Sequence, residues 1–541
     1  MPVGYDFYSH TFLETAMNTC KNALALIALT LACQTLAAQS SGAEPIQITI
    51  DAKQPGAVID KDVYGQFAEH LGTGIYGGLW VGPDSPIPNT RGWRNDVVAA
   101  LKNLQVPLVR WPGGCFADEY HWREGIGDRG ARPIKVNTNW GKVTESNAVG
   151  THEFFDLVEQ LGADAYVNGN LGSGSVREMA EWLEYMTSDS TSSLAELRRK
   201  NGHAAPFKVK YFAIGNEAWG CGGNMTVQHY TDLYNQYASF LKTPKNDTPI
   251  FIASGGHDED SSWSDYLSAH IHEQWNMHFD AVSFHYYTLP SGVWEKKGQA
   301  TGFGEVEWIS TLQRTLHIDT LIKNNIAKLD KNDPKKKIAF DVDEWGTWYD
   351  VEPGTNPGFL FQKNTLRDAI VAALNFNIFH THAERVRMTN IAQMVNVLQS
   401  MIVTDQDKML LTPTYYAYQM YVPFQNATVL PLHIQHNPDY HFGAFSIPEL
   451  SASAARTVDG KLVISVVNTN PNKAVDVTLA VPGRTRQSVS GQLLTAPAMD
   501  ALNTFDHPDQ VRPVAYAAKT VNGKLLLSLP PMSIVVLKAE F

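Results

Sequence analysis

Short apolar runs alternate with stretches of helical periodicity between about residues 60 and 392. Eight of the runs have the length and the β-branched or aromatic content of buried strands, and they cover residues 63–69, 106–111, 163–168, 208–217, 249–253, 281–285, 337–344 and 385–392. Apolar residues at three- and four-residue spacing predict helices over 151–161, 176–186, 226–241 and 365–381. This alternation predicts an α/β fold, a parallel sheet closed into a (β/α)8 TIM barrel.

The pattern changes near residue 430. Short strands are predicted over 451–458, 461–468, 475–481 and 524–529, and Asp-Gly, Asn-Pro-Asn, Pro-Gly and Asn-Gly turns separate them. They predict a C-terminal β-sandwich of jelly-roll type. A linker helix is expected near residues 412–421, where Thr412 is a suitable N-cap and Pro413 suits the first helical position. The expected domains are an N-terminal strand in 39–58 that joins the sandwich, the barrel in 59–395, and the linker helix and sandwich in 396–541.

The first 38 residues have the features of an export signal that begins late. Met17 is followed by a short basic segment, an apolar run over 23–32 and small residues suited to cleavage near residue 38. The apolar run is too short to span a bilayer. These features predict a signal peptide that starts at Met17 and an exported protein, periplasmic or extracellular; lipid attachment at Cys33 is the alternative.

Composition narrows the set of partners. The chain has 541 residues and a formal net charge of −12, which argues against nucleic acid because phosphate binding requires a basic surface. No longer apolar segment follows the N-terminal one, so no membrane partner is expected. His, Cys, Asp and Glu nowhere show metal-ligand spacing, and the sequence predicts neither a metal nor a cofactor.

Two carboxylates carry the candidate chemistry. Glu217 ends the fourth apolar run, within Gly215-Asn-Glu217, and Glu344 ends the seventh. Functional groups of a barrel gather where its strands end, and two carboxylates on one rim are what a glycosidase requires. Read singly, Glu217 could be a buried acid paired with an arginine, and Glu344 could belong to an ordinary acidic turn. The position of both glutamates at strand ends favours a catalytic role.

Other strand ends add polar groups. Glu69 ends the first run and could instead cap a helix. Arg110 precedes a Pro-Gly-Gly turn and could hold a carboxylate in place or form an ion pair under the rim. His285 ends the sixth run, and the hydroxyl of Tyr287 beyond it could keep a nucleophile ionised or could belong to a core aromatic. Gln393 ends the eighth run and could bind a sugar hydroxyl or the backbone.

Four longer motifs carry a family resemblance. Residues 65–70 (Gly-Gln-Phe-Ala-Glu-His), 110–122 (beginning Arg-Trp-Pro-Gly-Gly-Cys), 215–225 (beginning Gly-Asn-Glu-Ala-Trp-Gly) and 390–398 (beginning Asn-Ile-Ala-Gln) occur in this order. Together they resemble the α-L-arabinofuranosidases of glycoside hydrolase family 51, and the resemblance runs from about residue 45 to the C-terminus. It implies a retaining mechanism, a (β/α)8 barrel with a C-terminal β-sandwich, an arabinose-containing polysaccharide or oligosaccharide as substrate, and a trimer or hexamer.

The resemblance also implies roles for individual residues. Glu217 would be the general acid/base and Glu344 the nucleophile. The residues expected to bind the sugar, contact the nucleophile or wall the pocket are Glu69, Asn216, Gln393, Tyr287, Trp348 and Trp140, while Arg110 and His285 support them.

Cys115 departs from the family pattern. Many members have an asparagine after the Pro-Gly-Gly turn, and a thiol is a weaker hydrogen-bonding group than an amide. Cys115 is retained as a substrate-binding candidate. Cys221 lies just beyond Glu217, so a Cys115–Cys221 disulfide and two free thiols are both open.

Two other functions compete with arabinofuranosidase activity. An endoglucanase or a β-xylosidase could use the same two glutamates in a pocket of different shape. A carbohydrate-binding protein without turnover is the more distant alternative. The sequence does not distinguish arabinan from arabinoxylan as the polymer.

Overall fold

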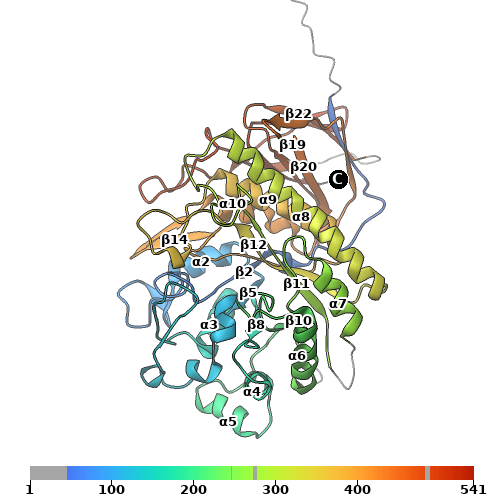
Figure 1. Cartoon of the computed structure of the whole chain (residues 1–541). Coiled ribbons are helices and arrows are strands. Elements are labelled where there is room, and N and C mark those ends of the chain that lie inside the picture. Colours follow the sequence, from blue (N-terminus) through green and yellow to red (C-terminus); the bar gives the residue numbers. More distant parts are fainter. Residues whose placement is uncertain (1–44, 245–246, 272–276, 482–487, 541) are drawn as a thin grey trace, which may run out of the picture. The chain divides into compact units, whose positions relative to one another are not determined.

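The computed structural model describes residues 45–244, 247–271, 277–481 and 488–540. The signal peptide predicted in residues 1–38 lies outside them. Eight parallel strands close into a barrel (Figure 1): β2 (Gly65–Phe67), β5 (Leu108–Trp111), β8 (Asp164–Gly169), β9 (Tyr211–Ile214), β10 (Ile250–Ala253), β11 (Ala281–Thr288), β12 (Ala339–Thr347) and β13 (Thr389–Ile391). Each strand falls within or overlaps one of the eight predicted runs, which confirms the barrel.

Helices follow the barrel strands. They are α2 (Asn95–Asn103), α3 (Thr151–Leu161), α4 (Val176–Thr187), α5 (Ser193–Lys200), α6 (Val227–Phe240), α7 (Ser262–His270), α8 (Glu305–Asn332), α9 (Leu366–Thr381) and α10 (Pro413–Tyr421). The side chains of Ser175, Thr226 and Thr412 accept a hydrogen bond from the third helical backbone N–H, and that of Thr365 from the second. Such caps satisfy N–H groups that have no partner inside the helix, which is why these helices begin there.

Short elements lie in the barrel loops and in the segment between the barrel and the sandwich. The 3-10 turns are η1 (Lys61–Tyr64), η2 (Cys115–Glu119), η3 (Trp122–Gly125), η4 (Arg129–Ala131), η5 (Pro357–Phe359) and η6 (Val422–Phe424). Two-stranded ribbons pair β3 (Asn89–Thr90) with β4 (Trp93–Arg94), β6 (Lys135–Val136) with β7 (Thr144–Glu145), β14 (Ile402–Asp405) with β15 (Lys408–Leu411), and β18 (Asp439–Phe442) with β19 (Phe445–Pro448). Among the described residues, no helix combines the length and apolarity needed to cross a membrane.

An irregular register joins the two longest barrel strands. β11 and β12 pair in parallel, and the register shifts between Ser283 and His285, so that His285 lies opposite Glu344. Bulges of this kind re-aim side chains and are frequent beside active sites. The shift therefore sets two candidate site residues side by side at the rim.

The C-terminal part is a sandwich of two sheets. One has the order β17 (Leu432–Gln435), β1 (Ile46–Ile50), β22 (Val475–Ala480), β26 (Lys524–Leu529), β25 (Lys519–Val521). The other has the order β16 (Thr428–Val429), β20 (Leu450–Arg456), β21 (Leu462–Asn468), β27 (Ser533–Glu540), β23 (Ser488–Leu494), β24 (Val514–Tyr516). Ile48 and Leu479 of the first sheet share a buried core with Ile464 and Leu537 of the second. The N-terminal strand β1 thus lies inside the first sheet.

Barrel helices pack against the sandwich. Helix α9 contacts β20 of the sandwich, and α8 contacts β19 of the separate β18–β19 ribbon (Figure 1). The Nδ2 of Asn377 donates to Ser451 Oγ at 3.1 Å, and Trp308 Nε1 donates to the carbonyl of Thr469 at 2.9 Å. Because α9 is covered on all sides, almost every residue in it is buried.

Removing the side chain of Ile48 tests whether β1 belongs to the sandwich core. Ile48 is fully buried between the sheets, whereas the side chain of Thr49 points to the opposite face of the same strand and is half-buried. We expect Ile48→Ala to lower the free energy of unfolding by about 2–5 kcal/mol, because it leaves a cavity. Urea unfolding measures the change. Thr49→Ala is the matched control, and equal losses in the two variants would contradict this role of β1.

Candidate active site

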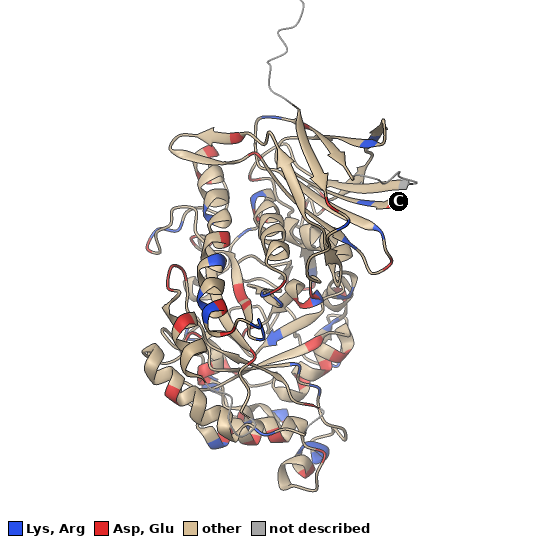
Figure 2. Ribbon diagram, turned by 90° about the vertical axis from the view of Figure 1, so that its right-hand side faces the viewer, with Lys and Arg blue, Asp and Glu red and all other residues tan. Residues whose placement is uncertain are grey.

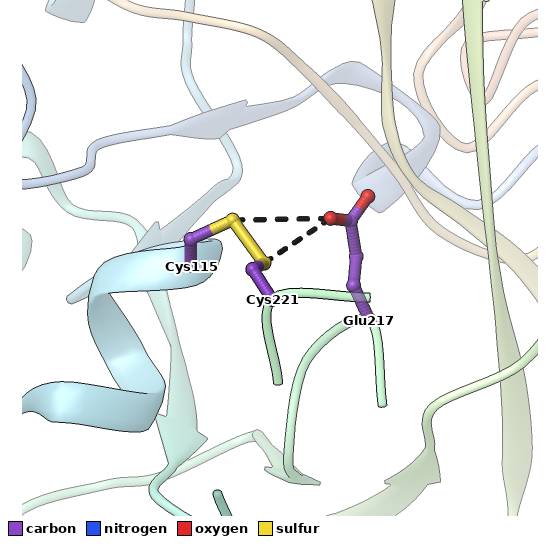
Figure 3. Close-up of side chains that lie close together, drawn as sticks. All are labelled: Cys115, Glu217 and Cys221. Atoms are coloured by element: carbon purple, nitrogen blue, oxygen red, sulfur yellow. Dashed lines mark hydrogen bonds between the residues drawn. A yellow bond between two sulfur atoms is a disulfide. The ribbon is translucent and has the colours of Figure 1, made fainter. Parts of the chain in front are cut away.

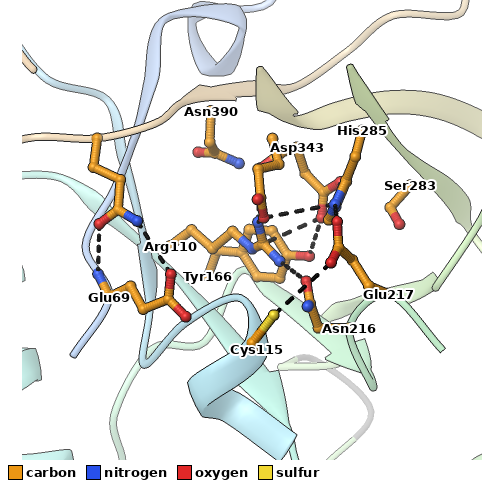
Figure 4. Close-up of polar contacts among 12 residues, drawn as sticks. Glu69, Arg110, Cys115, Tyr166, Asn216, Glu217, Ser283, His285, Asp343 and Asn390 are labelled. Atoms are coloured by element: carbon orange, nitrogen blue, oxygen red, sulfur yellow. Dashed lines mark hydrogen bonds and ion pairs between the residues drawn. The ribbon is translucent and has the colours of Figure 1, made fainter. Parts of the chain in front are cut away.

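The predicted site residues meet at the ends of the barrel strands (Figure 4). They come from segments far apart in the sequence: Glu69 follows β2, Arg110 lies in β5, Asn216 and Glu217 follow β9, His285 and Tyr287 lie in β11, Glu344 lies in β12, and Gln393 follows β13. The carboxyl ends of parallel strands share one rim. Contacts among these residues show that the rim is a single connected site.

Arg110 is the central donor of the site, and its side chain is buried. Its Nη1 donates to Glu344 Oε2 at 2.9 Å, and its Nη2 donates to Asn216 Oδ1 at 2.6 Å. Burial alone would lower the pKa of this guanidinium, but the charges of Asp343 and Glu344 outweigh burial and raise it. Arg110 therefore stays charged and holds the candidate nucleophile in one orientation.

His285 joins the two catalytic candidates. Its Nδ1 lies 2.8 Å from Glu217 Oε1 and 3.6 Å from Glu344 Oε2, and its Nε2 lies 3.2 Å from Asp343 Oδ1. Burial lowers the pKa of His285, but the charges of Glu344 and Asp343 and the hydrogen bonds to Asp343 and Glu217 raise it to about 10. The ring is therefore an imidazolium at neutral pH, and both of its nitrogens can donate.

Glu217 and Glu344 lie close together. One carboxylate oxygen of each, with a ring nitrogen of His285, falls within 4.8 Å of the others. Retaining glycosidases hold their two carboxyl groups about 5–5.5 Å apart, whereas inverting enzymes leave about 6.5–9.5 Å for a water molecule. The spacing in this site fits direct attack by one of the carboxylates.

Tyr287 completes the surroundings of Glu344. Its hydroxyl donates to Glu344 Oε1 at 2.7 Å, whereas Arg110 donates to the other oxygen, Oε2. Burial and the charge of Glu344 raise the pKa of Tyr287 well above its usual value, so the phenol keeps its proton and remains a donor. Both oxygens of Glu344 thus accept a hydrogen bond, which fixes the orientation of the carboxylate.

Glu217 lies in a tight turn after β9. Its φ is 41° and that of Gly215 is 84°, so both occupy the left-handed region. This conformation is costly for a side chain other than glycine and persists where the surroundings enforce it. A Cβ on Gly222 would meet the carbonyl oxygen of Asn216 at 1.8 Å, so the Gly-Gly after Cys221 is needed for the turn to close.

Glu69 is buried at the same rim, where its carboxylate has donors of its own. Its Oε1 accepts from Trp140 Nε1 at 2.8 Å and from the backbone N–H of Phe116 at 3.0 Å, and its Oε2 accepts from Gln393 Nε2 at 3.1 Å. Burial and the charge of Glu344 raise the pKa of Glu69 to about 7, although the hydrogen bonds from Phe116 and Trp140 lower it. A Cβ on Gly114 would lie 2.9 Å from the carboxylate oxygens, which explains the glycines of the Pro-Gly-Gly turn.

Aromatic rings line the outer wall. Trp348 packs edge-on to Tyr287 with ring centroids 4.8 Å apart, and Trp140 is half-buried beside Glu69. Beyond them Trp294 is 44% exposed and packs edge-on to Trp348 at 5.3 Å. The ammonium of Lys297 lies over the faces of Trp294 and Trp348. The sequence analysis found Trp140 and Trp348 but missed Trp294.

Cys115 and Cys221 form a disulfide in the structure (Figure 3). It links η2 after β5 to the loop after β9 across 106 residues. The Sγ atoms lie 3.9 Å (Cys115) and 3.3 Å (Cys221) from Glu217 Oε2. Disulfide sulfurs carry no hydrogen, so these are close contacts without donation. Of the two alternatives left open by the sequence, the structure has the disulfide; sugar binding by Cys115 stays a prediction.

Three buried residues support the site without having been identified from the sequence. Asp118 accepts backbone N–H groups of Leu171, Gly172 and Asn216 at 2.7–3.0 Å, and burial raises its pKa to about 7 despite these donors. Tyr166 donates to Asp343 Oδ2 at 2.7 Å. Burial raises the pKa of Asp343, but Arg110 and His285 lower it below its usual value. No local pattern marks Asp118 or Tyr166; Asp343 adjoins Glu344 in the sequence.

Comparisons with known proteins agree with this geometry. The family model described as "Alpha-L-arabinofuranosidase 1 domain" matches residues 100–298, and the one described as "Alpha-L-arabinofuranosidase C-terminal domain" matches residues 343–533. The second match begins inside β12, so it covers the last two barrel strands as well as the sandwich. The domain boundary at 395/396 therefore stays a prediction from the sequence.

Full-length relatives are similar along nearly the whole chain. An "Intracellular exo-alpha-L-arabinofuranosidase" of Bacteroides ovatus is 46% identical over 91% of this chain and 95% of its own. A GH51 arabinofuranosidase structure from Xanthomonas axonopodis pv. citri has 52% identity and a TM-score of 0.89, covering 92% of this chain and all of that one. An α-L-arabinofuranosidase from Thermotoga maritima, solved as an arabinose complex, has 30% identity and a TM-score of 0.78 over the same shares.

One prediction is corrected by these relatives. The N-terminal residues predicted an exported protein, periplasmic or extracellular, but the Bacteroides ovatus relative is named as intracellular, which points against export. An apolar run after a single basic residue, Lys21, is a short and weakly specific pattern. The localisation inferred from it is therefore wrong by this comparison.

The fold, the paired glutamates on one rim and the two family matches lead to one assignment. The relative from Bacteroides ovatus, with 46% identity over 91% of this chain, is by itself similar enough to show the family. The chain belongs to the α-L-arabinofuranosidases of glycoside hydrolase family 51.

Proposed function

We propose that this chain releases terminal α-L-arabinofuranosyl residues from arabinose-containing polysaccharides or oligosaccharides by a retaining double displacement. The observation that carries the proposal is the approach of Glu217 and Glu344 to within 4.8 Å, with His285 between them. So close an approach of the two carboxylates suits the short separation of a retaining pair, in which one carboxylate attacks the sugar directly.

Glu344 is the nucleophile of the proposed reaction. Arg110 and Tyr287 each donate to one of its oxygens, so it is held in a fixed orientation before substrate arrives. Its carboxylate attacks C1 of the arabinofuranosyl unit, the bond from C1 to the leaving oxygen breaks, and a glycosyl ester forms.

Glu217 is the general acid and then the general base. Its Oε1 faces the charged ring of His285, whereas its Oε2 faces the two disulfide sulfurs, so the transferable proton belongs on Oε2. This proton goes to the leaving oxygen. Formation of the ester removes the negative charge of Glu344, which makes it easier for Glu217 to be ionised and to take a proton from the water that hydrolyses the ester.

The sugar pocket is formed by polar groups that face the nucleophile. Glu69, Gln393 and Asn216 offer carboxylate and amide groups in the geometry described above, and Trp140 and Trp348 wall the cavity. Buried polar groups that bond a sugar hydroxyl discriminate strongly against analogues that lack it. These residues are therefore proposed to recognise the arabinofuranose ring.

The exposed ring of Trp294 suits the sugar unit beyond the bond that is cleaved. It lies outside Trp348, and Lys297 covers part of its face. The formal charge of −12 and the mixture of Lys and Arg with Asp and Glu in Figure 2 favour an uncharged polymer. Family membership favours this function over an endoglucanase, a β-xylosidase or a non-catalytic binding protein. Assembly of the chain into a trimer or hexamer remains a prediction.

The two glutamates are expected to respond differently to truncation. Glu217→Ala should reduce kcat by about 10²–10⁴-fold on arabino-oligosaccharides, whose leaving group needs a proton. It should slow formation of the glycosyl-enzyme far less with 4-nitrophenyl α-L-arabinofuranoside, which has a good leaving group. Glu344→Ala should abolish turnover of both. Initial rates of sugar and nitrophenol release measure these losses.

Azide provides the control for these roles. In Glu217→Ala it should restore turnover, because azide attacks the glycosyl-enzyme without a base, and the product should be the α-linked azide after two inversions. Equal losses on the two substrates in Glu217→Ala, or a β-linked azide from that variant, would refute the assignment.

His285 is expected to set the pH range of activity. His285→Gln removes the positive charge that lies against Glu217, Asp343 and Glu344, so both limbs of the kcat/KM profile should move to higher pH. Rates measured from roughly pH 4 to 9, a range that includes ordinary carboxyl and histidine pKa values, test this. An unchanged profile, or a shift to lower pH, would contradict the role of the imidazolium.

Trp294 is expected to affect long substrates only. Trp294→Ala should raise KM for arabino-oligosaccharides about threefold to tenfold, as the loss of one aromatic contact allows. KM for 4-nitrophenyl α-L-arabinofuranoside should change little. Val293, its neighbour, is 49% exposed, and Val293→Ala is the matched control. Equal effects of Trp294→Ala on both substrates would exclude an outer sugar site.

A further inference from the structure

The Cys115–Cys221 disulfide places two sulfurs against an oxygen that the reaction uses. The Sγ atoms of Cys221 and Cys115 lie 3.3 and 3.9 Å from Glu217 Oε2 (Figure 3). The three side chains come from two loops and point toward one another. These three residues have no metal-ligand spacing in the sequence, because Cys115 is remote in the chain from the other two. The fold nevertheless brings two sulfur ligands and one oxygen ligand together.

The sulfur–oxygen distances match a tetrahedral zinc site. With Zn–S bonds of about 2.3 Å and a Zn–O bond of about 2.1 Å, a tetrahedral ion holds its sulfur and oxygen ligands about 3.6 Å apart. The two distances in the structure lie on either side of this value. Only the two sulfurs must move, because thiolates on one ion lie about 3.8 Å apart. Breaking the S–S bond frees them to do so.

The disulfide is open to a reductant. The residue Cys221 is exposed and Cys115 is half-buried, and they lie in loops at the rim of the barrel. Disulfides that small thiols can reach exchange readily, and in a reducing compartment such pairs persist as thiols. A disulfide sulfur has no charge to offer a cation, whereas two thiolates with a carboxylate form a soft, anionic ligand set.

We propose that reduction of Cys115–Cys221 creates a binding site for a thiophilic divalent cation, with Zn²⁺ or Cd²⁺ held by the two thiolates and by Glu217 Oε2. A dithiol reductant donates two electrons and two protons, becomes a disulfide itself, and leaves Cys115 and Cys221 as thiols. The cation then displaces one proton from each thiol and bonds to both sulfurs and to the carboxylate. Water takes the fourth position.

Occupancy of this site stops hydrolysis. The cation takes the oxygen from which Glu217 transfers its proton, so the leaving group cannot be protonated. This consequence rests on the proposed function of Glu217, whereas the site itself does not. In the oxidised protein the same cation finds no sulfur ligand. The disulfide therefore protects the acid/base from thiophilic metals.

A second trio of side chains is a weaker candidate. Glu217, His285 and Glu344 also offer three ligand atoms within 4.8 Å. The imidazole is charged at neutral pH, and Arg110 already occupies Glu344 Oε2. A cation there would have to displace two buried positive charges. At the thiol site the charged ring of His285 contacts Glu217 through Oε1, and Oε2 is left to the cation.

Cadmium titration tests the site without reference to activity. The purified protein is compared as isolated and after reduction with a phosphine that is then removed, with the thiol count and circular dichroism confirming two thiols and a retained fold. Adding Cd²⁺ should produce the thiolate-to-cadmium absorption band in the reduced protein only, saturating at one equivalent. No band in the reduced protein, an equal band in the oxidised protein, or loss of the fold on reduction would each overturn the proposal.

Two variants identify the ligands. Cys221→Ser removes one sulfur, and reduced Glu217→Gln removes the carboxylate; each should weaken Cd²⁺ binding at least tenfold in the absorption titration. Unchanged affinity in either variant would overturn the three-ligand site. Cys221→Ser also cannot form the disulfide, so its metal response should be the same with and without reductant.

Hydrolysis of 4-nitrophenyl α-L-arabinofuranoside tests whether the bound cation stops catalysis. Micromolar Cd²⁺ should reduce the rate of the reduced protein at least tenfold, and the rate of the oxidised protein by less than twofold. A chelator should restore the reduced rate, and failure to do so would overturn reversible binding. If the protein bound Cd²⁺ but hydrolysed nothing even without it, the proposed function would fail and the site would stand.

Discussion

The site depends on two buried cations that balance several carboxylates. Arg110 and His285 lie between Glu344, Asp343 and Glu217, and each cation contacts more than one of these acids. A buried charge without a partner costs several kcal/mol, and removing one member of such a pair leaves that cost uncompensated. Asp343 can therefore be buried with its pKa below the usual value, and Glu344 and Glu217 can lie beside it, because the two cations are present. The same cations form hydrogen bonds with Glu344 and Glu217, the proposed nucleophile and acid/base.

The barrel supplies this arrangement through irregularities in its strands. The register shift between β11 and β12 sets His285 opposite Glu344, and the left-handed turn at Glu217 brings the acid/base back over the rim. Asp118 fixes two loops at once by accepting their backbone N–H groups. Strain and buried polar groups are costly for folding, and they persist where neighbouring contacts enforce them. In this protein they coincide with the residues that carry the chemistry.

The sequence predicts the barrel well because all eight strands are short apolar runs, and it finds Glu217 and Glu344 because each ends one of them. It misses β27, the strand between β21 and β23. The apolar residues of this strand are consecutive, so they show no periodicity that would distinguish a strand from a helix. Asp118 escapes notice because its partners are backbone groups distant in the chain. The disulfide could be only an alternative, since the separation of two cysteines in sequence does not determine their pairing.

The two oxygens of Glu217 have different surroundings, and this difference follows from the disulfide. Oε1 accepts from the imidazolium of His285, which disfavours a proton on that oxygen, whereas Oε2 faces sulfurs that cannot donate. An asparagine at position 115, common in the family, could offer an N–H to the sugar or to the acid. With Cys115 bonded to Cys221, Glu217 Oε2 instead lies beside two sulfurs that carry no hydrogen. Cysteine in place of asparagine at position 115 therefore takes an amide donor away from the proposed acid/base and ties the loop after β5 covalently to the loop that carries Glu217.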